Sequence, residues 1–207
     1  MITLFIDTSS FDVSIAILNN DKVLNSIHKN TFTEHSKYAI SLIDELLKQS
    51  NLKPNEVNHI MVVNGPGSFT GIRIGLTIAK VYAYLLDIKV TLISSLKSIA
   101  LSYNNDNYIM SLIDAKNDNY YMGLYDNNYN EVIDEHFANI DEILELLDKY
   151  KNITIVSNKE IKVDNYKKID KLDIEKIYLY YKDKEKVNAH KVLPNYLKLP
   201  ASMENKK

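Results

Sequence analysis

"LFIDTSSFDVSIAILNN" (residues 4–20) is matched further along the chain by "SLIDAKNDNYYMGLYDNN" (residues 111–128), at an offset of 107 residues. The offset superposes identical or similarly apolar residues: Ile6 on Ile113, Asp7 on Asp114, Ile15 on Met122, Ile17 on Leu124 and Asn20 on Asn127. Each segment by itself has the pattern of a β-hairpin, and two unrelated hairpins can match by chance. A match that also repeats the order of the surrounding elements indicates internal duplication.

The order of the expected elements does repeat. In the first half the hydrophobic patterns predict strands at 2–6, 12–18 and 22–28, a helix at 35–49, a strand at 59–63, a helix at 70–86 and a strand at 89–93. In the second half they predict strands at 107–115, 119–126 and 130–137, a helix at 140–150, a strand at 152–157 and a helix at 171–186. Thr31 or Thr33 is expected to cap the first helix. The sequence therefore predicts an α/β protein of two similar lobes, residues 1–103 and a smaller 104–200, followed by a flexible tail at 201–207.

The composition restricts the possible chemistry. The chain has 207 residues, of which 45% are hydrophobic and 25% charged, as is typical of a globular protein. It contains no cysteine, which excludes thiolate catalysis, disulfide bonds and cysteine-ligated metal sites. No basic segment precedes the first strand, and the apolar segment 74–86 is short for a membrane span and contains Lys80, so we expect a cytoplasmic protein that does not enter a membrane. The net charge of −2 argues against nucleic-acid binding by the chain alone.

The segment "NGPGSFTGIRIG" (residues 64–75) holds four of the five glycines and joins an expected strand to an expected helix. A glycine-rich turn in this position can hold a phosphate, but the spacing matches neither the P-loop nor the dinucleotide fingerprint. The other interpretation is structural. Gly65 and Gly67 would form a tight turn, Ser68 or Thr70 would cap the helix, and the later glycines would allow close packing. Both interpretations stay open at this point.

A second candidate is "IDTSS", at the end of the first strand. Asp7, Thr8 and Ser9 could position a phosphate or its metal, or they could simply close a hairpin through an Asx turn. Asp114 lies at the matching place in the second half. Two carboxylates facing a cleft from symmetric lobes would form a plausible ATP site.

The histidines predict no metal site. His28, His35, His59, His136 and His190 are scattered, with no HxxxH or HExxH pair that would place two imidazoles on one helical face. Their spacing also gives no basis for a Ser–His–Asp triad, because triads assemble only in space.

The expected helix 70–86 is apolar on almost every side. A helix of this kind must be covered on both sides, and one sheet covers only one of them. The second cover is either the neighbouring helix 35–49 or a partner protein.

Several of these segments, in this order, resemble the TsaB (YeaZ) family: "LFIDTSS", "EHSKYAISLIDELL", "VVNGPGSFTGIRIGLTIAKVYAYLL", "ISSLKSIA", "SLIDAKNDNYYMGLYD" and "PNYLK". The resemblance implies an actin-like (ASKHA) fold of two RNase H-like lobes, with the second lobe reduced. It also implies a role in making threonylcarbamoyladenosine in tRNA, as the noncatalytic partner of the paralogue TsaD, together with the ATPase TsaE. Binding of tRNA through the complex only, a homodimer when the chain is alone, and no cofactor of its own are further expectations.

The resemblance also bears on individual residues. TsaD proteins carry a metal-binding HxxxH pair where this chain has Ser95 and Ile99, neither of which replaces an imidazole ligand. Helices 35–49 and 70–86 are expected to pack against the equivalent pair of TsaD as a four-helix bundle. The candidate interface residues are Tyr38, Leu42, Ile72, Ile74, Ile78 and Tyr82.

Three alternatives remain at this stage. The first is a small ATPase or kinase that uses Asp7, Thr8 and Asp114. In the TsaB interpretation these three residues, with Ser9, Gly65 and Gly67, would instead be a vestigial phosphate loop. The second is a metallopeptidase of the glycoprotease type, which the missing histidine pair disfavours. The third is direct tRNA binding, which the acidic balance disfavours.

Overall fold

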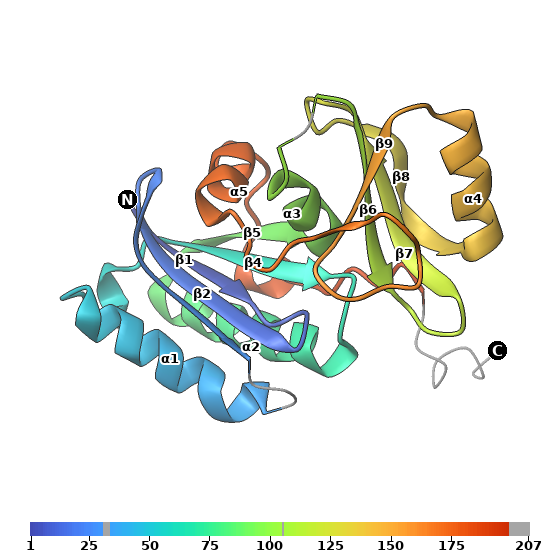
Figure 1. Cartoon of the computed structure of the whole chain (residues 1–207). Helices are drawn as coiled ribbons and strands as arrows, with labels where there is room; N and C mark the ends of the chain where they lie inside the picture. The colour runs from blue at the N-terminus through green and yellow to red at the C-terminus, as the bar shows by residue number, and fades with distance from the viewer. Residues whose placement is uncertain (31–33, 105, 199–207) are drawn as a thin grey trace. The chain divides into compact units, whose positions relative to one another are not determined.

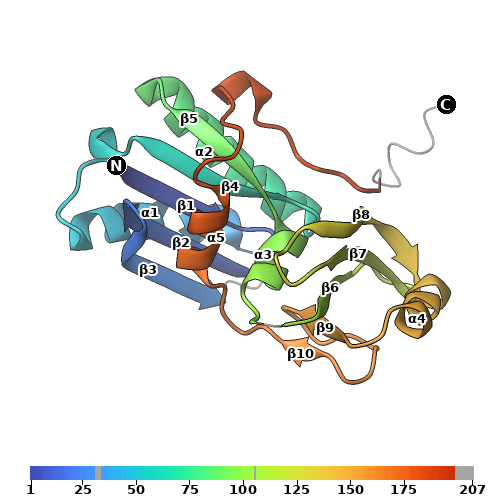
Figure 2. The ribbon, with the colours of Figure 1, turned by 90° about the horizontal axis from the view of Figure 1, so that it is seen from above.

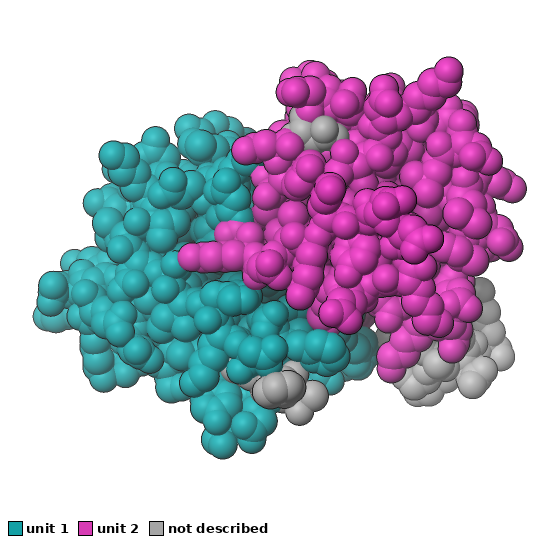
Figure 3. Space-filling model, in the orientation of Figure 1, with its two compact units in different colours: residues 1–95, 173–194 teal, residues 96–172, 195–207 magenta. Residues whose placement is uncertain are grey.

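A computed structural model describes residues 1–30, 34–104 and 106–198. The expected capping residues Thr31 and Thr33 and the expected tail 201–207 lie outside the described residues. The chain forms two compact units (Figure 3), Met1–Ser95 with Asp173–Pro194, and Leu96–Leu172 with the segment from Asn195 onward. The sequence predicted one boundary between the lobes, at residue 103. In the structure the chain passes to the second unit at residue 96 and returns to the first unit for residues 173–194, where Tyr178 and Val192 are buried.

The first unit is built on a five-stranded sheet with the order β3-β2-β1-β4-β5. Its strands are β1 (Ile2–Asp7), β2 (Asp12–Asn19), β3 (Lys22–Asn30), β4 (His59–Gly65) and β5 (Lys89–Ser94). The first three strands are antiparallel to one another, and β4 and β5 run parallel to β1. The helices of this unit are α1 (His35–Gln49), α2 (Phe69–Leu86) and α5 (Ile174–Tyr181), with short 3-10 turns η1 (Pro54–Glu56) and η2 (Ala189–Lys191).

The second unit repeats this sheet (Figure 2). Its strands, in the order β8-β7-β6-β9-β10, are β6 (Tyr108–Asp114), β7 (Asn119–Tyr125), β8 (Glu131–Asn139), β9 (Ile153–Ser157) and β10 (Lys167–Lys168). The strand directions also match, because β6, β7 and β8 are antiparallel while β9 and β10 continue parallel to β6. Its helices are α3 (Ser95–Leu101), whose first residue falls in the first unit, and α4 (Ile140–Lys149). Segment 158–166, which joins β9 to β10, contains no helix, so the counterpart of α2 is missing.

The duplication predicted from the two matched segments is therefore confirmed, and the fold is an actin-like α/β fold with two RNase H-like units, the second one reduced. The two hairpins differ in one respect. Ile6 pairs with Ile15 in the first, whereas Ile113 pairs with Tyr121 in the second. The second connecting loop is thus one residue shorter, and the superposition of Ile15 on Met122 is shifted by one residue in the structure.

The core of the first unit lies between one face of its sheet and two helices. Leu4, Ile6 and Ile15 point from the sheet toward α1 and α2, and they pack with apolar residues of both helices. Figure 1 shows α1 and α2 on this face and α5 on the opposite face. By length and composition alone α2 could cross a membrane, yet in the structure one side of it is packed against this sheet.

Candidate functional site

The glycine loop is held tightly against the loop between β1 and β2. Gly65 and Gly67 both have a positive φ, of 119° and 156°. A Cβ atom on Gly67 would lie 2.4 Å from the carbonyl oxygen of Ser9, and the amide of Ser68 donates to that oxygen at 2.7 Å. Since no side chain fits in this space, Gly67 is required by the close approach of the two loops.

The start of α2 continues this close contact. Ser68 caps the helix, because its Oγ accepts a hydrogen bond from the amide of Gly71 at 3.2 Å. A Cβ on Gly71 would lie 2.0 Å from the carbonyl oxygen of Thr8, and one on Gly75 would lie 2.5 Å from Thr8 Oγ1. Thr8 Oγ1 itself donates to the carbonyl oxygen of Gly71 at 2.7 Å. Gly71 therefore permits close packing of α2 on the backbone of the β1–β2 loop, and Gly75 leaves room for the Thr8 side chain.

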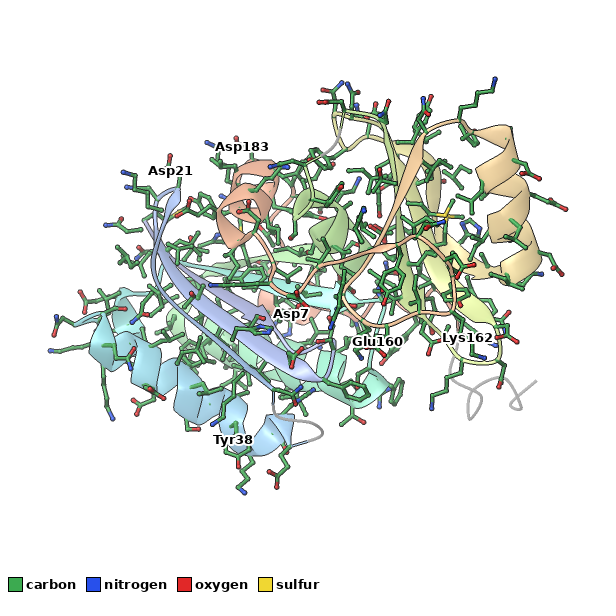
Figure 4. All side chains as sticks on the ribbon, in the orientation of Figure 1. Asp7, Asp21, Tyr38, Glu160, Lys162 and Asp183 are labelled. Atoms are coloured by element: carbon green, nitrogen blue, oxygen red, sulfur yellow. The ribbon has the colours of Figure 1, made fainter. Side chains whose placement is uncertain are left out.

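Asp7 lies at the end of β1 (Figure 4) and is buried, with 6% of its surface exposed. Its Oδ1 accepts a hydrogen bond from the amide of Ser9 at 2.8 Å, which closes an Asx turn. Burial raises the pKa of this carboxyl group, while the hydrogen bonds from Ser9 and the charges of His28 and His35 act in the opposite direction. The amide of Ser9 and the hydroxyl of Thr8 are thus both used inside the unit.

Asp114 makes the equivalent turn in the second unit, where its Oδ1 accepts a hydrogen bond from the amide of Lys116 at 3.0 Å. Unlike Asp7, Asp114 is exposed. The two carboxylates therefore share a local turn but differ in environment.

Ser95 and Ile99 have structural contacts. The Ser95 hydroxyl donates to the carbonyl oxygen of Pro66, and Ile99 is buried in an apolar cluster of the second unit. Within residues 1–30, 34–104 and 106–198, no group of three or more His, Asp or Glu side chains could hold a metal ion.

Four of the five histidines each contact a different group, and the fifth, His28, contacts Ser14. His35 Nε2 lies 2.6 Å from the Ser10 carbonyl oxygen, His59 Nε2 lies 2.9 Å from Thr91 Oγ1, His136 Nε2 lies 2.6 Å from Glu142 Oε1, and the His190 ring packs edge-on against Tyr84.

One cluster could not be found from sequence spacing. Ser14 pairs with His28 across two strands, and Ser14 Oγ lies 2.8 Å from His28 Nδ1. Asp12 Oδ2 is 3.9 Å from His28 Nε2, which is too long for a hydrogen bond. The imidazole is therefore not oriented by a carboxylate in the way that a Ser–His–Asp triad requires.

The outward face of α2 leaves several apolar side chains uncovered within the first unit. Val81, Tyr84 and Leu85 are 50%, 69% and 72% exposed, because α1 lies beside α2 and does not cover this face. Together with Thr70, Ile74 and Thr77 they follow the spacing of one helical stripe. We call these six residues the α2 stripe. Ile40 of α1, 61% exposed, is a further apolar side chain on the same helix pair.

The six residues expected at an interface divide into two groups. Leu42, Ile72 and Ile78 are buried in the core of the unit, while Tyr38, Ile74 and Tyr82 are half-buried at its edge. Two lysine amines also lie over the Tyr38 ring in cation–π contacts, with Lys29 Nζ 4.6 Å and Lys37 Nζ 5.0 Å from the ring centroid. The residues that sequence reasoning left out are Val81, Tyr84, Leu85 and Ile40. A helical-wheel projection anchored on the buried glycines would have placed the first three on the outward face.

Comparisons with known proteins connect this fold to a family. The chain is 37% identical over 117 residues to "tRNA threonylcarbamoyladenosine biosynthesis protein TsaB" of Bacillus subtilis, which is 56% of this chain and 51% of that protein. It is 27% identical over 202 residues to the protein of the same name from Buchnera aphidicola subsp. Acyrthosiphon pisum, covering 93% of this chain and 87% of that one. The family model for TsaD, tRNA N6-adenosine threonylcarbamoyltransferase, matches residues 25–182, well over half of the chain.

The chain belongs to the TsaD/TsaB family. The aligned segment spans about half the length of the Bacillus TsaB relative. Among solved structures, YeaZ from Pseudomonas aeruginosa superposes with a TM-score of 0.78 at 20% identity, covering 94% of this chain and 99% of that one. A second structure, of an uncharacterised protein similar to peptidase YeaZ from Pseudomonas aeruginosa, superposes with a TM-score of 0.81 at 21% identity and covers 95% and 99% of the two chains. These two structures share the fold of the TsaD/TsaB family member described above.

Proposed function

We propose that this chain is a noncatalytic subunit of the cytoplasmic machinery that makes threonylcarbamoyladenosine in tRNA, and that it binds and activates a TsaD-type threonylcarbamoyltransferase. Membership of the TsaD/TsaB family and the printed names of the TsaB relatives support the link to this tRNA modification. The single observation that carries the partner role is the α2 stripe, which leaves Tyr84 and Leu85 about 70% exposed on a helix whose other side is packed in a core.

Burial of the stripe supplies a driving force for docking. Fully burying a side chain of the size of Val81, Leu85 or Ile40 contributes about 1.5–3 kcal/mol relative to leaving it in water. A paralogue of the same fold offers an equivalent pair of parallel helices, and two such pairs can pack as a four-helix bundle. TsaD is therefore the partner that we propose for this surface.

The noncatalytic part of the proposal rests on two local observations. Ser95 and Ile99, at the positions of the paralogue's metal-binding histidines, are a backbone-bonded hydroxyl and a core side chain. In the β1–β2 loop the groups that would hold a phosphate, among them the Ser9 amide and the Thr8 hydroxyl, are engaged within the unit. Both observations favour a subunit that relies on its partner for metal and nucleotide chemistry.

The proposal is tested by co-expressing the chain with the TsaD of its own organism and measuring threonylcarbamoyl transfer to tRNA with and without it. We expect both copurification and a clear increase in transfer rate. Leu85→Asp and Tyr84→Asp should abolish copurification without unfolding the chain, because a charge on an exposed position is tolerated until a partner covers it. Leu144→Asp, at a half-exposed leucine of α4 in the second unit, is the matched control and should copurify normally. Normal copurification of Leu85→Asp and Tyr84→Asp would remove the α2 stripe from the interface.

Two further partners follow from the same proposal. The ATPase TsaE is expected to join the pair, and tRNA is expected to bind to the complex and not to this acidic chain alone. Without TsaD, the α2 stripe is expected to pair two copies of this chain. Sedimentation of the purified chain should then show a concentration-dependent dimer that Leu85→Asp converts to a monomer. A dimer that persists in this variant would place the self-association elsewhere.

A further inference from the structure

The β1–β2 loop, which carries the "DTSS" motif, holds the first turns of both α1 and α2. Toward α2, the carbonyl oxygen of Ser9 accepts from the Ser68 amide at 2.7 Å, and the Thr8 hydroxyl donates to the Gly71 carbonyl oxygen at 2.7 Å. Toward α1, the carbonyl oxygen of Ser10 lies 2.6 Å from His35 Nε2. The motif that suggested a phosphate site therefore connects the two helices of the proposed docking surface (Figure 1).

His35 is the residue at the centre of this arrangement. It is the first residue of α1, and it is buried. Because a carbonyl oxygen can only accept a hydrogen bond, His35 Nε2 carries a proton and donates to Ser10. The ring also lies next to the start of α2, where a Cβ added to Gly71 would come within 3.2 Å of His35 Cδ2. The imidazole of α1 thus contacts the loop and lies beside the α2 position where glycine has no side chain.

The hydrogen bond of His35 also anchors an end of α1 that lacks a side-chain cap. The Glu34 side chain, at the N-cap position, accepts no capping hydrogen bond from a backbone amide of the first turn and contacts only the Lys37 side chain there. At the other end of α1, Gln49 Oε1 accepts a hydrogen bond from Asn25 Nδ2 at 2.9 Å, which ties the helix to β3. The apolar core shared by the two helices also relates α1 to α2, and the His35 contact adds a polar anchor at the start of α1.

We propose that His35 is a positioning residue for partner binding: it holds the start of α1 to the β1–β2 loop, which is itself bonded to the start of α2, and so helps to set the spacing of the two helices that form the docking surface. This inference rests on the proposed function. Two helix pairs pack in a bundle only when their side chains interdigitate at the density of a protein interior, so a small shift of α1 against α2 lowers the affinity. A preformed pair also avoids the entropy cost of ordering the helices on binding.

The test measures the affinity of the full-length chain for TsaD by titration calorimetry. His35→Ala removes the hydrogen bond to Ser10 and should weaken binding at least tenfold. His35→Gln keeps an N–H donor at nearly the same distance from the backbone and should restore affinity to within about threefold of the wild type. Ile43→Val, a conservative change at a buried position of the same helix, is the control for lost stability and should bind like the wild type. Hydrogen exchange in the first turns of α1 and α2 should speed up in His35→Ala and return toward the wild-type rate in His35→Gln.

The outcomes separate the two proposals. Unchanged affinity of His35→Ala would overturn the positioning role, as would a loss of affinity in His35→Gln or in Ile43→Val equal to that in His35→Ala. If the wild-type chain itself fails to bind TsaD, the proposed function fails, and the role of His35 in partner binding fails with it. If the wild-type chain binds TsaD and all variants bind it equally well, the positioning role of His35 is wrong but the proposed function is not contradicted.

Discussion

At the scale of single residues, the glycines of residues 64–75 have a structural purpose that the sequence left open. Gly67 and Gly71 lie where any side chain would collide with the carbonyl oxygens of Ser9 and Thr8. The sequence offered phosphate binding or close packing for these positions, and the contacts of the described residues correspond to close packing. The capping residue is Ser68, and Thr70 instead lies on the exposed side of the helix.

Gly71→Ala tests this packing directly. Alanine favours a helix over glycine by up to about 1 kcal/mol, but its Cβ would lie 2.0 Å from the Thr8 carbonyl oxygen, so the helix or the loop must move. We expect a net destabilisation of about 1–3 kcal/mol, as for other overpacked sites, measured by urea denaturation. Thr77→Ala, on the exposed side of the same helix, should be neutral or slightly stabilising. An equally stable Gly71→Ala variant would mean that α2 and the β1–β2 loop are not in close contact.

His59 makes the stability of the chain depend on pH. Burial, together with the charge of Lys186, lowers the pKa of His59 from 6.5 to about 4. Between pH 6.5 and about 4, His59 is protonated in the unfolded chain but not in the folded chain. The contribution of neutral His59 to the free energy of unfolding is therefore complete above about pH 6.5 and decreases as the pH falls toward about 4. The loss should be on the order of 2–3 kcal/mol. His59→Gln should flatten this part of the curve in chemical denaturation between pH 7.5 and 4.5, whereas His190→Gln should leave it unchanged. A His59→Gln curve as steep as that of the wild type would contradict the assignment.

At the scale of elements, α2 shows that a hydrophobic pattern can predict a helix without predicting which of its faces is buried. The run of apolar residues predicted a helix at 70–86, and the structure has one at Phe69–Leu86. Because the helix is apolar nearly all round, the pattern could not tell the core face from the outward face, and Ile72 and Ile78, expected at an interface, are buried. The helix expected at 171–186 ends at Tyr181, since the charged residues that follow have no apolar face to pack. The sequence did not predict α3, which has seven residues, or β10, which has two, because such short elements show too little hydrophobic periodicity.

The start of α4 is tied to β8 by a charged histidine. His136 Nδ1 lies 2.7 Å from the Asp134 carbonyl oxygen and Nε2 lies 2.6 Å from Glu142 Oε1, so both nitrogens must donate and the ring is an imidazolium. Partial burial lowers the pKa of His136, but the hydrogen bonds to Asp134 and Glu142 and the charges of these residues outweigh it and raise the pKa above 6.5.

This tether should stabilise the chain at low pH and be lost as the pH rises through the raised pKa of His136. Both side chains are partly exposed, so the effect should be only about 0.5–1 kcal/mol. Glu142→Gln should lower the stability more at pH 5.5 than at pH 8.5, measured by thermal denaturation. Glu145→Gln on the same helix should show no such difference between the two pH values. A Glu142→Gln effect that is the same at both pH values would rule out a charged pair.

At the scale of the whole molecule, duplication is the organising feature. Residues 4–20 and 111–128 predicted two related lobes, and both sheets have the same strand order and strand directions. The sequence did not predict that residues 173–194 return to the first unit or that the second hairpin loop is one residue shorter. Both features depend on which surfaces meet after the chain has folded, and local periodicity contains no information on that.

The sequence by itself determined the elements, their repeated order and the family, because the spacing of apolar residues and glycines reflects local backbone geometry. Only the tertiary structure decided how the polar groups of "DTSS" are used and which side of α2 faces outward. Thr8 and Gly71 are 63 residues apart, and their hydrogen bond forms only once β1 and α2 are packed together. Such hydrogen bonds depend on the three-dimensional arrangement of the chain, so the contacts of "DTSS" with the two helices could not be predicted from the motif alone.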